Sequence, residues 1–324
     1  MLIGCTNHPL KVDVSNVQVP ETHINRLDRD VFEMDTTNVL KQTEALNKKY
    51  GLFFKVFCAG ILNSGVVRDT NYSGKLKRFI ADRDMRAAYN DCKQQYNDIQ
   101  FLENDFTDAA RHFKYYFPKR GIPKVVAMFT GFNYNITPVD STIGVGLDMY
   151  LGSNNKFYDM LAFPKYKSRW MTKECIMPDA VRQWLLTQFP YNMKANDFVS
   201  QIIYFGKIMY LTDALLPEVA DTLKLQYTPR QLRYCTVNEF NMWNYFIAQK
   251  VLYTTDQAEI MKFTAEGPFT SAFNKEAPSR VGYWMGYRIV KQYMEKNPNI
   301  TLEQLMSETD GQQLLMKSKY KPAK

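Results

Sequence analysis

Histidine is scarce in this chain of 324 residues, which contains only His8, His23 and His112. None of them belongs to an H-E-x-x-H motif, the helical pattern that holds catalytic zinc in many peptidases. All three lie within the first 112 residues of the chain, and no Ser-His or Cys-His pairing is evident. The scarcity argues against zinc hydrolysis of the usual kind, and we predict neither a metal site nor a cofactor.

Cysteine is also sparse, and no two of the five cysteines form a C-x-x-C pair. This excludes a zinc ribbon and a redox motif. Cys58, Cys92, Cys175 and Cys235 are expected to be small hydrophobic core residues, although their wide spacing also permits disulfides. No charge-free run reaches about 18 residues, so the sequence predicts no transmembrane helix. Internal repeats and low-complexity runs are missing too, which favours one continuous domain.

The formal net charge of +8 suggests nucleic acid at first sight, but it is unevenly distributed. The final segment contributes Lys317, Lys319, Lys321 and Lys324 without a single acid, so the body carries 8 − 4 = +4. The other basic residues alternate with acids, as in KLKRFIADRDMR, which is typical of solvated helix faces. We therefore predict no nucleic-acid partner.

The start of the chain carries a possible lipidation signal. Residues 2–5 read LIGC, which resembles a bacterial lipobox in which Cys5 becomes the lipidated residue. A signal peptide also needs a basic start and an apolar core of about 7 to 15 residues, and only three residues precede Gly4. Two alternatives stay open: Cys5 is lipidated after an upstream leader is removed, or it is an ordinary cysteine in a frayed terminus.

Hydrophobic residues make up 45% of the chain and aromatic residues 14%, enough for a large core. We predict a tether over residues 1–11 and a single α+β domain over residues 12–324, helical to about residue 120. Alternation over residues 12–19 predicts a short strand, followed by a charged turn over residues 25–30. Helices are predicted over residues 40–49, 52–62, 83–100 and 105–117.

The pattern changes to strands after residue 120. The β-branched run over residues 124–129 and the alternating stretch STIGVGLDMY over residues 141–150 are predicted to be adjacent strands of one sheet. Gly144 and Gly146 fall on one face of the second strand. They indicate either a smooth groove, where another backbone or a peptide could approach, or a bend or bulge.

The stretch over residues 195–216 is apolar almost all the way round, which predicts a buried central helix. One narrow polar stripe follows Asp197, Ser200 or Gln201, Tyr204 and Lys207. A polar stripe on a buried helix is typical of a helix that faces a cleft, and we expect one here. A helix with a proline at its start is predicted before it, over residues 178–189.

Two capping boxes mark further helix starts, at Thr228 and at Thr301. The first helix is predicted to run to about residue 249, with Glu239 and Trp243 on one side because they are four residues apart. The second is predicted to be short and to be followed by a lysine-rich tail. Between them, residues 278–294 form a predicted helix in which Gly282 and Gly286 imply a close neighbour, because each glycine costs about 1 kcal/mol in a helix interior.

Several long stretches together resemble one known family. They are LIGC, LDMYLG, IIYFGKIMYLTDALLP, VNEFNMWNYF, PSRVGYWMGYRIVKQYM and LMKSKYKP. In this order they resemble the gliding motility lipoprotein GldB family of Bacteroidota, most strongly from about residue 141 onward. The resemblance implies a periplasm-facing lipoprotein, in the outer membrane, that is associated with gliding and its secretion machinery. It also implies a relationship to predicted gluzincin-type zinc peptidases, and hence a zincin-like fold with a small sheet packed on the central helix.

When the zinc-binding and catalytic roles of these peptidases are assigned to positions of this sequence, most of the required side chains are missing. If residues 203–207 overlie H-E-x-x-H, Ile203 and Lys207 replace the two histidines and Tyr204 replaces the general base. None of them can serve a zinc ion. Glu239 alone matches a glutamate ligand of the family, and it could pair with Lys207 instead. Alternatively, Lys207 extends to solvent, and Glu239 is a surface or packing carboxylate.

The remaining candidates are aromatic. Tyr283 and Tyr287 are expected either at the degenerate cleft or, more simply, in the core with their hydroxyls satisfied. The sequence thus predicts a catalytically degenerate, peptidase-like lipoprotein that binds envelope proteins. The alternatives are a hydrolase or peptidase with an unconventional active site using Glu239, and, if LIGC is accidental, a basic cytosolic protein.

Overall fold

The computed structural model describes residues 10–64, 72–192 and 194–323 of the chain. The chain divides into two compact units. The sheet unit comprises residues 18–110 and 119–184, and the helical unit comprises residues 1–17, 111–118 and 185–324. Each is described by itself below, and a single continuous domain over residues 12–324 stays a prediction.

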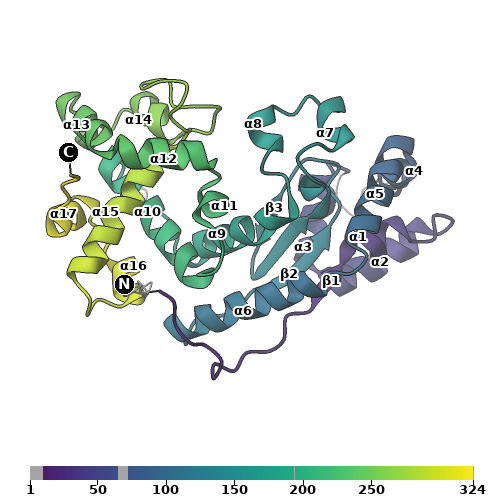
Figure 1. Ribbon diagram of the computed structural model, residues 1–324. Helices are drawn as coiled ribbons and strands as arrows, with labels where there is room; N and C mark the ends of the chain where they lie inside the picture. Colours follow the sequence, from purple (N-terminus) through teal and green to yellow (C-terminus); the bar gives the residue numbers. More distant parts are fainter. Residues whose placement is uncertain (1–9, 65–71, 193, 324) are drawn as a thin grey trace, which may run out of the picture. The chain divides into compact units, whose positions relative to one another are not determined.

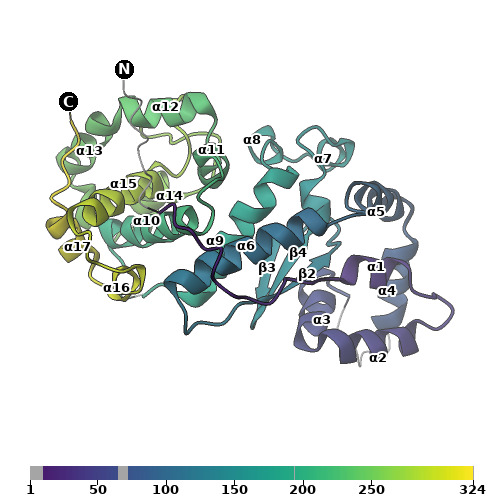
Figure 2. The same ribbon diagram turned by 60° about the horizontal axis from the view of Figure 1, so that its bottom comes forward.

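The sheet unit contains four strands in the order β1-β2-β4-β3 (Figures 1 and 2). They are β1 (Ile24–Arg26), β2 (Lys124–Met128), β3 (Ile136–Val139) and β4 (Thr142–Gly146). β2 pairs in parallel with β1 and β4, whereas β3 is the antiparallel edge strand. The predicted strand over residues 124–129 and its adjacency to the stretch at 141–150 are therefore confirmed. The mostly helical α+β class is confirmed as well.

The glycine face of β4 is not an open groove. A Cβ atom on Gly144 would lie 2.5 Å from the Phe53 ring, and one on Gly146 would overlap the carbonyl oxygen of Tyr134. Another backbone does approach here, but it belongs to the same chain and fills the space. β4 also ends earlier than predicted, because residues Leu147–Tyr150 form the 3-10 helix η2.

The start of the sheet unit differs from the prediction. Residues 12–19 form no strand, and the expected charged turn over residues 25–30 is instead β1 followed by α1 (Leu27–Phe32). Buried Asp28 explains the difference, because Arg26 binds its carboxylate through two nitrogens, at 2.9 and 2.6 Å. Arg26 also donates to the carbonyl of Tyr96. This pairing allows charged residues to occupy core positions.

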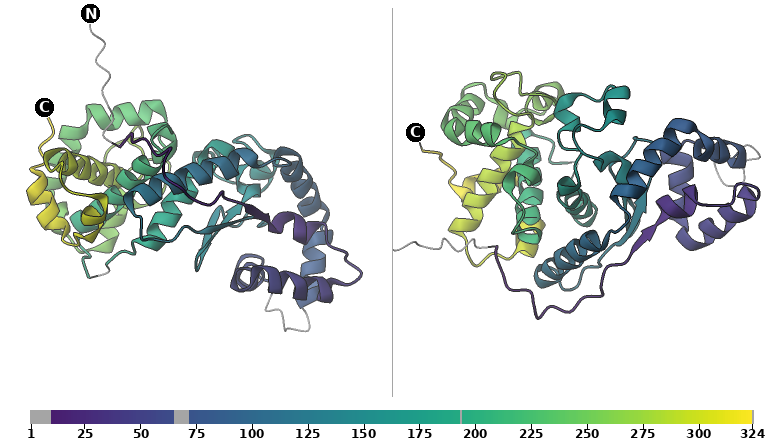
Figure 3. Two further views of the ribbon diagram at one scale, coloured as in Figure 1. Left: turned by 90° about the horizontal axis from the view of Figure 1, so that it is seen from below. Right: turned by 45° about the vertical axis from the view of Figure 1, so that its right-hand side comes forward.

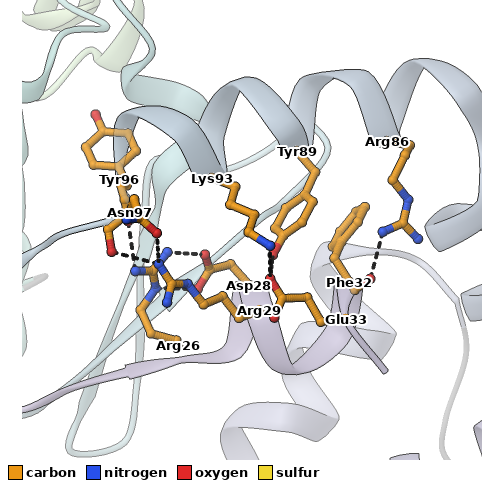
Figure 4. A network of polar contacts seen from close by, with 10 residues as sticks. All are labelled: Arg26, Asp28, Arg29, Phe32, Glu33, Arg86, Tyr89, Lys93, Tyr96 and Asn97. Carbon is orange, nitrogen blue, oxygen red and sulfur yellow. Dashed lines mark hydrogen bonds and ion pairs between the residues drawn. The ribbon is translucent and has the colours of Figure 1, made fainter. Parts of the chain in front are cut away.

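Further polar contacts join α1 to α5 (Arg83–Gln95) and the residues after it (Figure 4). Glu33 accepts a hydrogen bond from Tyr89 and forms an ion pair with Lys93 at 2.8 Å. Arg86 donates to the carbonyl of Phe32. These contacts fix α1 against α5.

The other helices of the front part follow the predicted pattern with different bounds. They are α2 (Val39–Tyr50), α3 (Leu52–Val56) with the π-helix η1 (Phe57–Ile61), α4 (Tyr72–Ala81) and α6 (Gln100–Tyr116). Two short helices, α7 (Lys156–Met160) and α8 (Lys165–Ser168), and the 3-10 turn η3 (Lys173–Cys175) follow the sheet. The helix predicted over residues 178–189 is α9 (Ile176–Gln188). The cysteines at 58, 92, 175 and 235 are fully buried, which confirms their expected place in the core.

The helical unit is built around α10 (Phe198–Leu215), which confirms the predicted central helix. Fifteen of its residues are buried, which explains why its sequence is apolar on nearly every side. α15 (Val281–Lys296) crosses it (Figures 1 and 3). A Cβ atom on Gly286 would overlap the carbonyl oxygen of Ile202, so the predicted close neighbour of the glycine pair is α10 itself.

The remaining elements of the helical unit surround this pair. They are α11 (Asp221–Leu225), α12 (Pro229–Val237), α13 (Glu239–Ala248), η4 (Val251–Tyr253), α14 (Gln257–Thr264), α16 (Leu302–Ser307) and α17 (Gly311–Ser318). Both capping boxes, at Thr228 and Thr301, are confirmed. The helix predicted to run to residue 249 is interrupted at Asn238, whose side chain donates back to the carbonyl of Tyr234. The sequence analysis did not predict α17, which packs on α15 and α10.

The four strands belong to the sheet unit and α10 belongs to the helical unit. Within the helical unit, α10 packs chiefly against α15 and α17. The predicted packing of the sheet on the central helix stays a prediction.

Candidate functional site

The predicted site residues of the described chain all lie in the helical unit, on three helices. Ile203, Tyr204 and Lys207 lie on α10, Glu239 begins α13, and Tyr283 and Tyr287 lie on α15. Cys5 lies outside the described residues.

Lys207 is buried, with 6% of its surface exposed, and its ammonium donates to the backbone carbonyl of Glu308. The pKa of Lys207 is lowered to about 8. Burial lowers it, and the negative charge of Glu308 acts in the opposite direction. Two predictions are therefore wrong: Lys207 neither extends to solvent nor pairs with Glu239. The acceptor belongs to the segment between α16 and α17, for which the sequence predicted no such contact.

Glu239 is also buried and has two partners of its own. Its carboxylate accepts from Arg288 Nε at 2.8 Å and from the hydroxyl of Tyr320 at 2.5 Å. Tyr320 in turn packs edge-on against Trp243, with ring centroids 5.1 Å apart. The prediction that Glu239 and Trp243 project from one side is confirmed, and of the two alternatives for Glu239 the packing carboxylate is correct.

Other residues on and beside the polar stripe also make contacts within the protein, although Tyr204 and Asp197 are only half-buried. Tyr204 donates to the carbonyl of Phe189 at 2.7 Å, and burial raises its pKa to about 12. Ile203 is 1% exposed and makes hydrophobic contacts. At the start of the helix, Asp197 caps α10 and accepts from Gln312. A Cβ atom on Gly311 would lie 2.6 Å from the Cα of Ser200, so α17 covers this end of the stripe. The expected cleft along the stripe is thus filled by the chain's own C-terminal helices.

Of the two tyrosines of α15, Tyr287 is buried and Tyr283 is half-buried. Tyr283 stacks on Phe205 with ring centroids 4.1 Å apart. The hydroxyl of Tyr287 donates a hydrogen bond to the carboxylate of Asp213. Burial raises the pKa of Tyr287, and the negative charge of Asp213 raises it as well. The expectation of core aromatics with satisfied hydroxyls is confirmed for Tyr287.

Sequence reasoning missed the ion pair beneath Tyr287. Lys224 lies 2.6 Å from Asp213, and the two side chains are 4% and 5% exposed. A second carboxylate, Asp221, lies 3.1 Å from the same ammonium. Asp213 falls within an apolar run, which was a usable signal, because a charge in such a run is rarely buried without a partner.

These charged groups are held by contacts within the helical unit: Lys207 by a backbone carbonyl, Glu239 by Arg288 and Tyr320, and Asp213 by Lys224. Within residues 10–64, 72–192 and 194–323, no three His, Cys, Asp or Glu side chains converge to hold a metal ion. The polar groups among the predicted site residues are therefore used in contacts within the chain.

An open pocket of about 840 Å³ does exist in the helical unit, at a different place. It is lined by the segment at Leu10 and Val12, the last turn of α6, Tyr210 of α10, the last turn of α15 and the loop over residues 298–302. This volume lies within the range of about 300 to 1,000 Å³ that ligand sites commonly have.

Two polar groups of this pocket differ from those of the buried core. Tyr210 is 5% exposed, yet its hydroxyl makes no hydrogen bond to any residue that the structure describes. Glu295 is exposed, and its carboxylate likewise has no partner within the described part of the chain. Burial, together with the neighbouring Tyr116, Asp213 and Glu295, raises the pKa of Tyr210 to about 12. The hydroxyl is therefore protonated at neutral pH.

Comparison with known proteins decides the family. The model of the family described as gliding motility protein GldB matches residues 7–322, nearly the whole chain. The chain belongs to the GldB family. No curated protein and no solved structure was found to match it.

Membership in the GldB family makes this chain a lipoprotein associated with gliding motility. The match includes the central helix, the glycine-bearing α15 and the pocket, so these features belong to the GldB-family region of the chain. Among the described helices, none is both long enough and apolar enough to cross a membrane.

Proposed function

We propose that this GldB-family chain is a non-catalytic binding protein of the cell envelope. In this proposal Cys5 carries a lipid anchor in the outer membrane, and the folded chain faces the periplasm of a Bacteroidota cell. Its partner is another protein of the gliding or secretion machinery, and the contact is made through the pocket of the helical unit. Neither a metal nor a cofactor takes part.

One contrast carries the proposal. The groups that would perform catalysis on a peptidase-like scaffold are used internally: Lys207 by Glu308, and Glu239 by Arg288 and Tyr320. The pocket instead presents Tyr210 and Glu295 with hydrogen-bonding capacity that no described residue uses. Unused polar groups around a ligand-sized hollow with apolar and tyrosine side chains in its wall are typical of a binding site.

A zincin-like ancestry remains part of the proposal. It assigns the two lost histidine positions to Ile203 and Lys207, the lost general base to Tyr204 and the surviving glutamate ligand to Glu239. In this proposal the ion pair of Glu239 with Arg288 occupies the place of the former glutamate–metal contact.

The test uses a gliding bacterium in which the gene has been deleted and is resupplied on a plasmid. We expect the Glu239→Gln protein to restore colony spreading, since no catalysis is lost, whereas Glu295→Gln combined with Tyr210→Phe does not. Circular dichroism and protein levels in the cell verify that both proteins are folded, because Glu239→Gln also weakens buried contacts to Arg288 and Tyr320. Purified protein is assayed in parallel against a peptide library. Peptide hydrolysis that disappears in Glu239→Gln would establish the hydrolase alternative and overturn the proposal.

The anchor is tested separately by metabolic labelling with a radioactive fatty acid. We expect label on the wild-type protein and none on Cys5→Ala, with Cys235→Ala as the control, since Cys235 is buried in the core. Label that persists in Cys5→Ala would contradict the anchor at this position.

A further inference from the structure

We infer that the pocket of the helical unit receives a basic side chain, lysine or arginine, from a segment of the partner protein. This inference rests on the proposed binding function and adds the chemistry of the ligand. It follows from the charge, the aromatic walls and the unused hydrogen-bonding groups of the pocket.

The charge of the pocket is negative. Glu295 is its charged lining residue, and none of the described residues forms an ion pair with it. Three lysines next to the lining segments have partners elsewhere: Lys11 pairs with Glu218 at 2.8 Å, Lys114 donates to the carbonyl of Pro118 and Lys296 donates to the carbonyl of Ser318. The carboxylate is therefore available to a cation from outside.

The walls suit the cation and its aliphatic stem. Tyr115 and Tyr116 form an edge-to-face pair with ring centroids 4.9 Å apart, and Tyr115 is 50% exposed. Aromatic faces attract guanidinium and ammonium groups by about 0.5 to 1 kcal/mol at exposed sites. The apolar side chains of Leu10, Val12 and Leu302 provide contacts for the methylene stem of the incoming residue.

The hydroxyl of Tyr210 completes the arrangement. It lies deep in the wall, it is protonated at neutral pH, and its oxygen can accept a hydrogen bond from a guanidinium or ammonium. Tyr116 has already used its proton on the carbonyl of Leu10, at 3.3 Å, so its oxygen is likewise left to accept. The hydroxyl oxygens of Tyr210 and Tyr116 and the carboxylate of Glu295 can accept hydrogen bonds from a lysine or arginine side chain, which only donates them. The negative charge of the carboxylate disfavours an anion.

The experiment uses three capped tripeptides, acetyl-Leu-X-Leu-amide, in which X is arginine, norleucine or glutamate. Binding to the full chain is measured by ligand-observed NMR at low and high salt. We expect the arginine peptide to bind about tenfold more tightly than the norleucine peptide, from one partly screened ion pair and one cation–π contact, and the glutamate peptide not to bind. High salt should reduce the preference.

Variants locate the contact. Glu295→Gln should remove most of the preference for arginine, and Tyr210→Phe should weaken arginine binding by about three- to fivefold, the value of one hydrogen bond. Glu44→Gln, an exposed carboxylate on α2, is the matched control and should change nothing. Circular dichroism of each variant verifies that the fold is retained.

The outcomes separate the two proposals. Equal binding of the arginine and norleucine peptides, no binding of either, or arginine binding that is unchanged in the double variant Tyr210→Phe/Glu295→Gln would overturn the basic-ligand inference. If that double variant nevertheless fails to restore gliding, the binding function stands and only the ligand chemistry is wrong. If it restores gliding fully, the pocket is not the binding site and both fail.

Discussion

Gly206 of α10 and Gly286 of α15 face each other where the two helices cross, and neither position has room for a single additional carbon. A Cβ atom on Gly206 would overlap the carbonyl group of Gly286, and one on Gly286 would overlap that of Ile202. The two backbones are thus in direct contact at the centre of the helical unit. This contact sets how deeply α10 is buried and therefore where Tyr210 and Lys207 lie.

The first prediction concerns this crossing. Gly286→Ala should lower the free energy of unfolding by at least about 3 kcal/mol, since one of the two helices must move to relieve the overlap. Urea denaturation followed by circular dichroism measures the change. Gly74→Ala is the control: a Cβ atom at Gly74 meets nothing within 4 Å, so this variant should gain up to about 1 kcal/mol from helix propensity. Equal stabilities of the two variants would contradict the crossing geometry.

The second prediction concerns the buried pair of Asp213 and Lys224. Asp213→Asn should destabilise the helical unit by about 3 to 5 kcal/mol, because it removes the nearer of the two carboxylates that face the buried ammonium of Lys224. Adding Lys224→Met should recover a large part of the loss. Thermal unfolding of the single and double variants measures both effects.

The exposed pair of Lys165 and Asp159 gives the comparison for this second prediction. Asp159→Asn should cost no more than about 1 kcal/mol, because water screens an exposed pair. A similar cost at Asp159 and Asp213 would show that the Asp213 pair is not buried as described.

The third prediction concerns pH and Asp148 of the sheet unit. Burial raises the pKa of Asp148 to about 6, although the amides of Phe132 and Thr130 and the hydroxyl of Thr130 donate to it. The unfolded chain protonates this carboxyl near 3.8, so the folded state binds the proton more strongly between these values. Its contribution to stability should therefore increase as the pH falls from about 6 to about 4, by up to roughly 3 kcal/mol.

Asp148→Asn tests the sign of this dependence. The variant should be less stable at every pH, because an amide offers one acceptor oxygen where the carboxylate offers two. The difference between wild type and variant should widen on acidification from pH 6 to pH 4. Urea midpoints taken at half-unit steps of pH measure it, and a difference that narrows instead would show that the native state holds Asp148 ionised throughout.

The fourth prediction concerns the attachment of the C-terminal segment. Tyr320→Phe should cost about 1 to 2 kcal/mol, since it removes a hydrogen bond to the buried carboxylate of Glu239. Hydrogen exchange should accelerate in α17 and be unchanged in α10. Tyr253→Phe is the matched control, because Tyr253 is 61% exposed, and it should alter neither region. Equal acceleration of hydrogen exchange in α17 and α10 would show that the substitution destabilises the whole helical unit and does not open the C-terminal segment alone.

Local chemistry in the sequence determined many elements of this protein. The apolar run of α10, the capping boxes at Thr228 and Thr301 and the strand at β2 could be predicted because helix periodicity, N-cap hydrogen bonds and β-branched runs act over a few residues. The glycine spacing on α15 even indicated a close neighbour. The family resemblance rested on the same contiguous stretches.

Only the tertiary structure decided which polar residues are used and which remain available. Lys207 and Glu239 were plausible partners in sequence, yet each is bound by a group from a segment far along the chain, Glu308 and Arg288 with Tyr320. Tyr210 and Glu295, which no motif marks, come together at the pocket because α10 and α15 cross where their glycines meet. Pairing between distant segments depends on how helices pack, and packing is set by the whole core, which no short stretch of sequence contains.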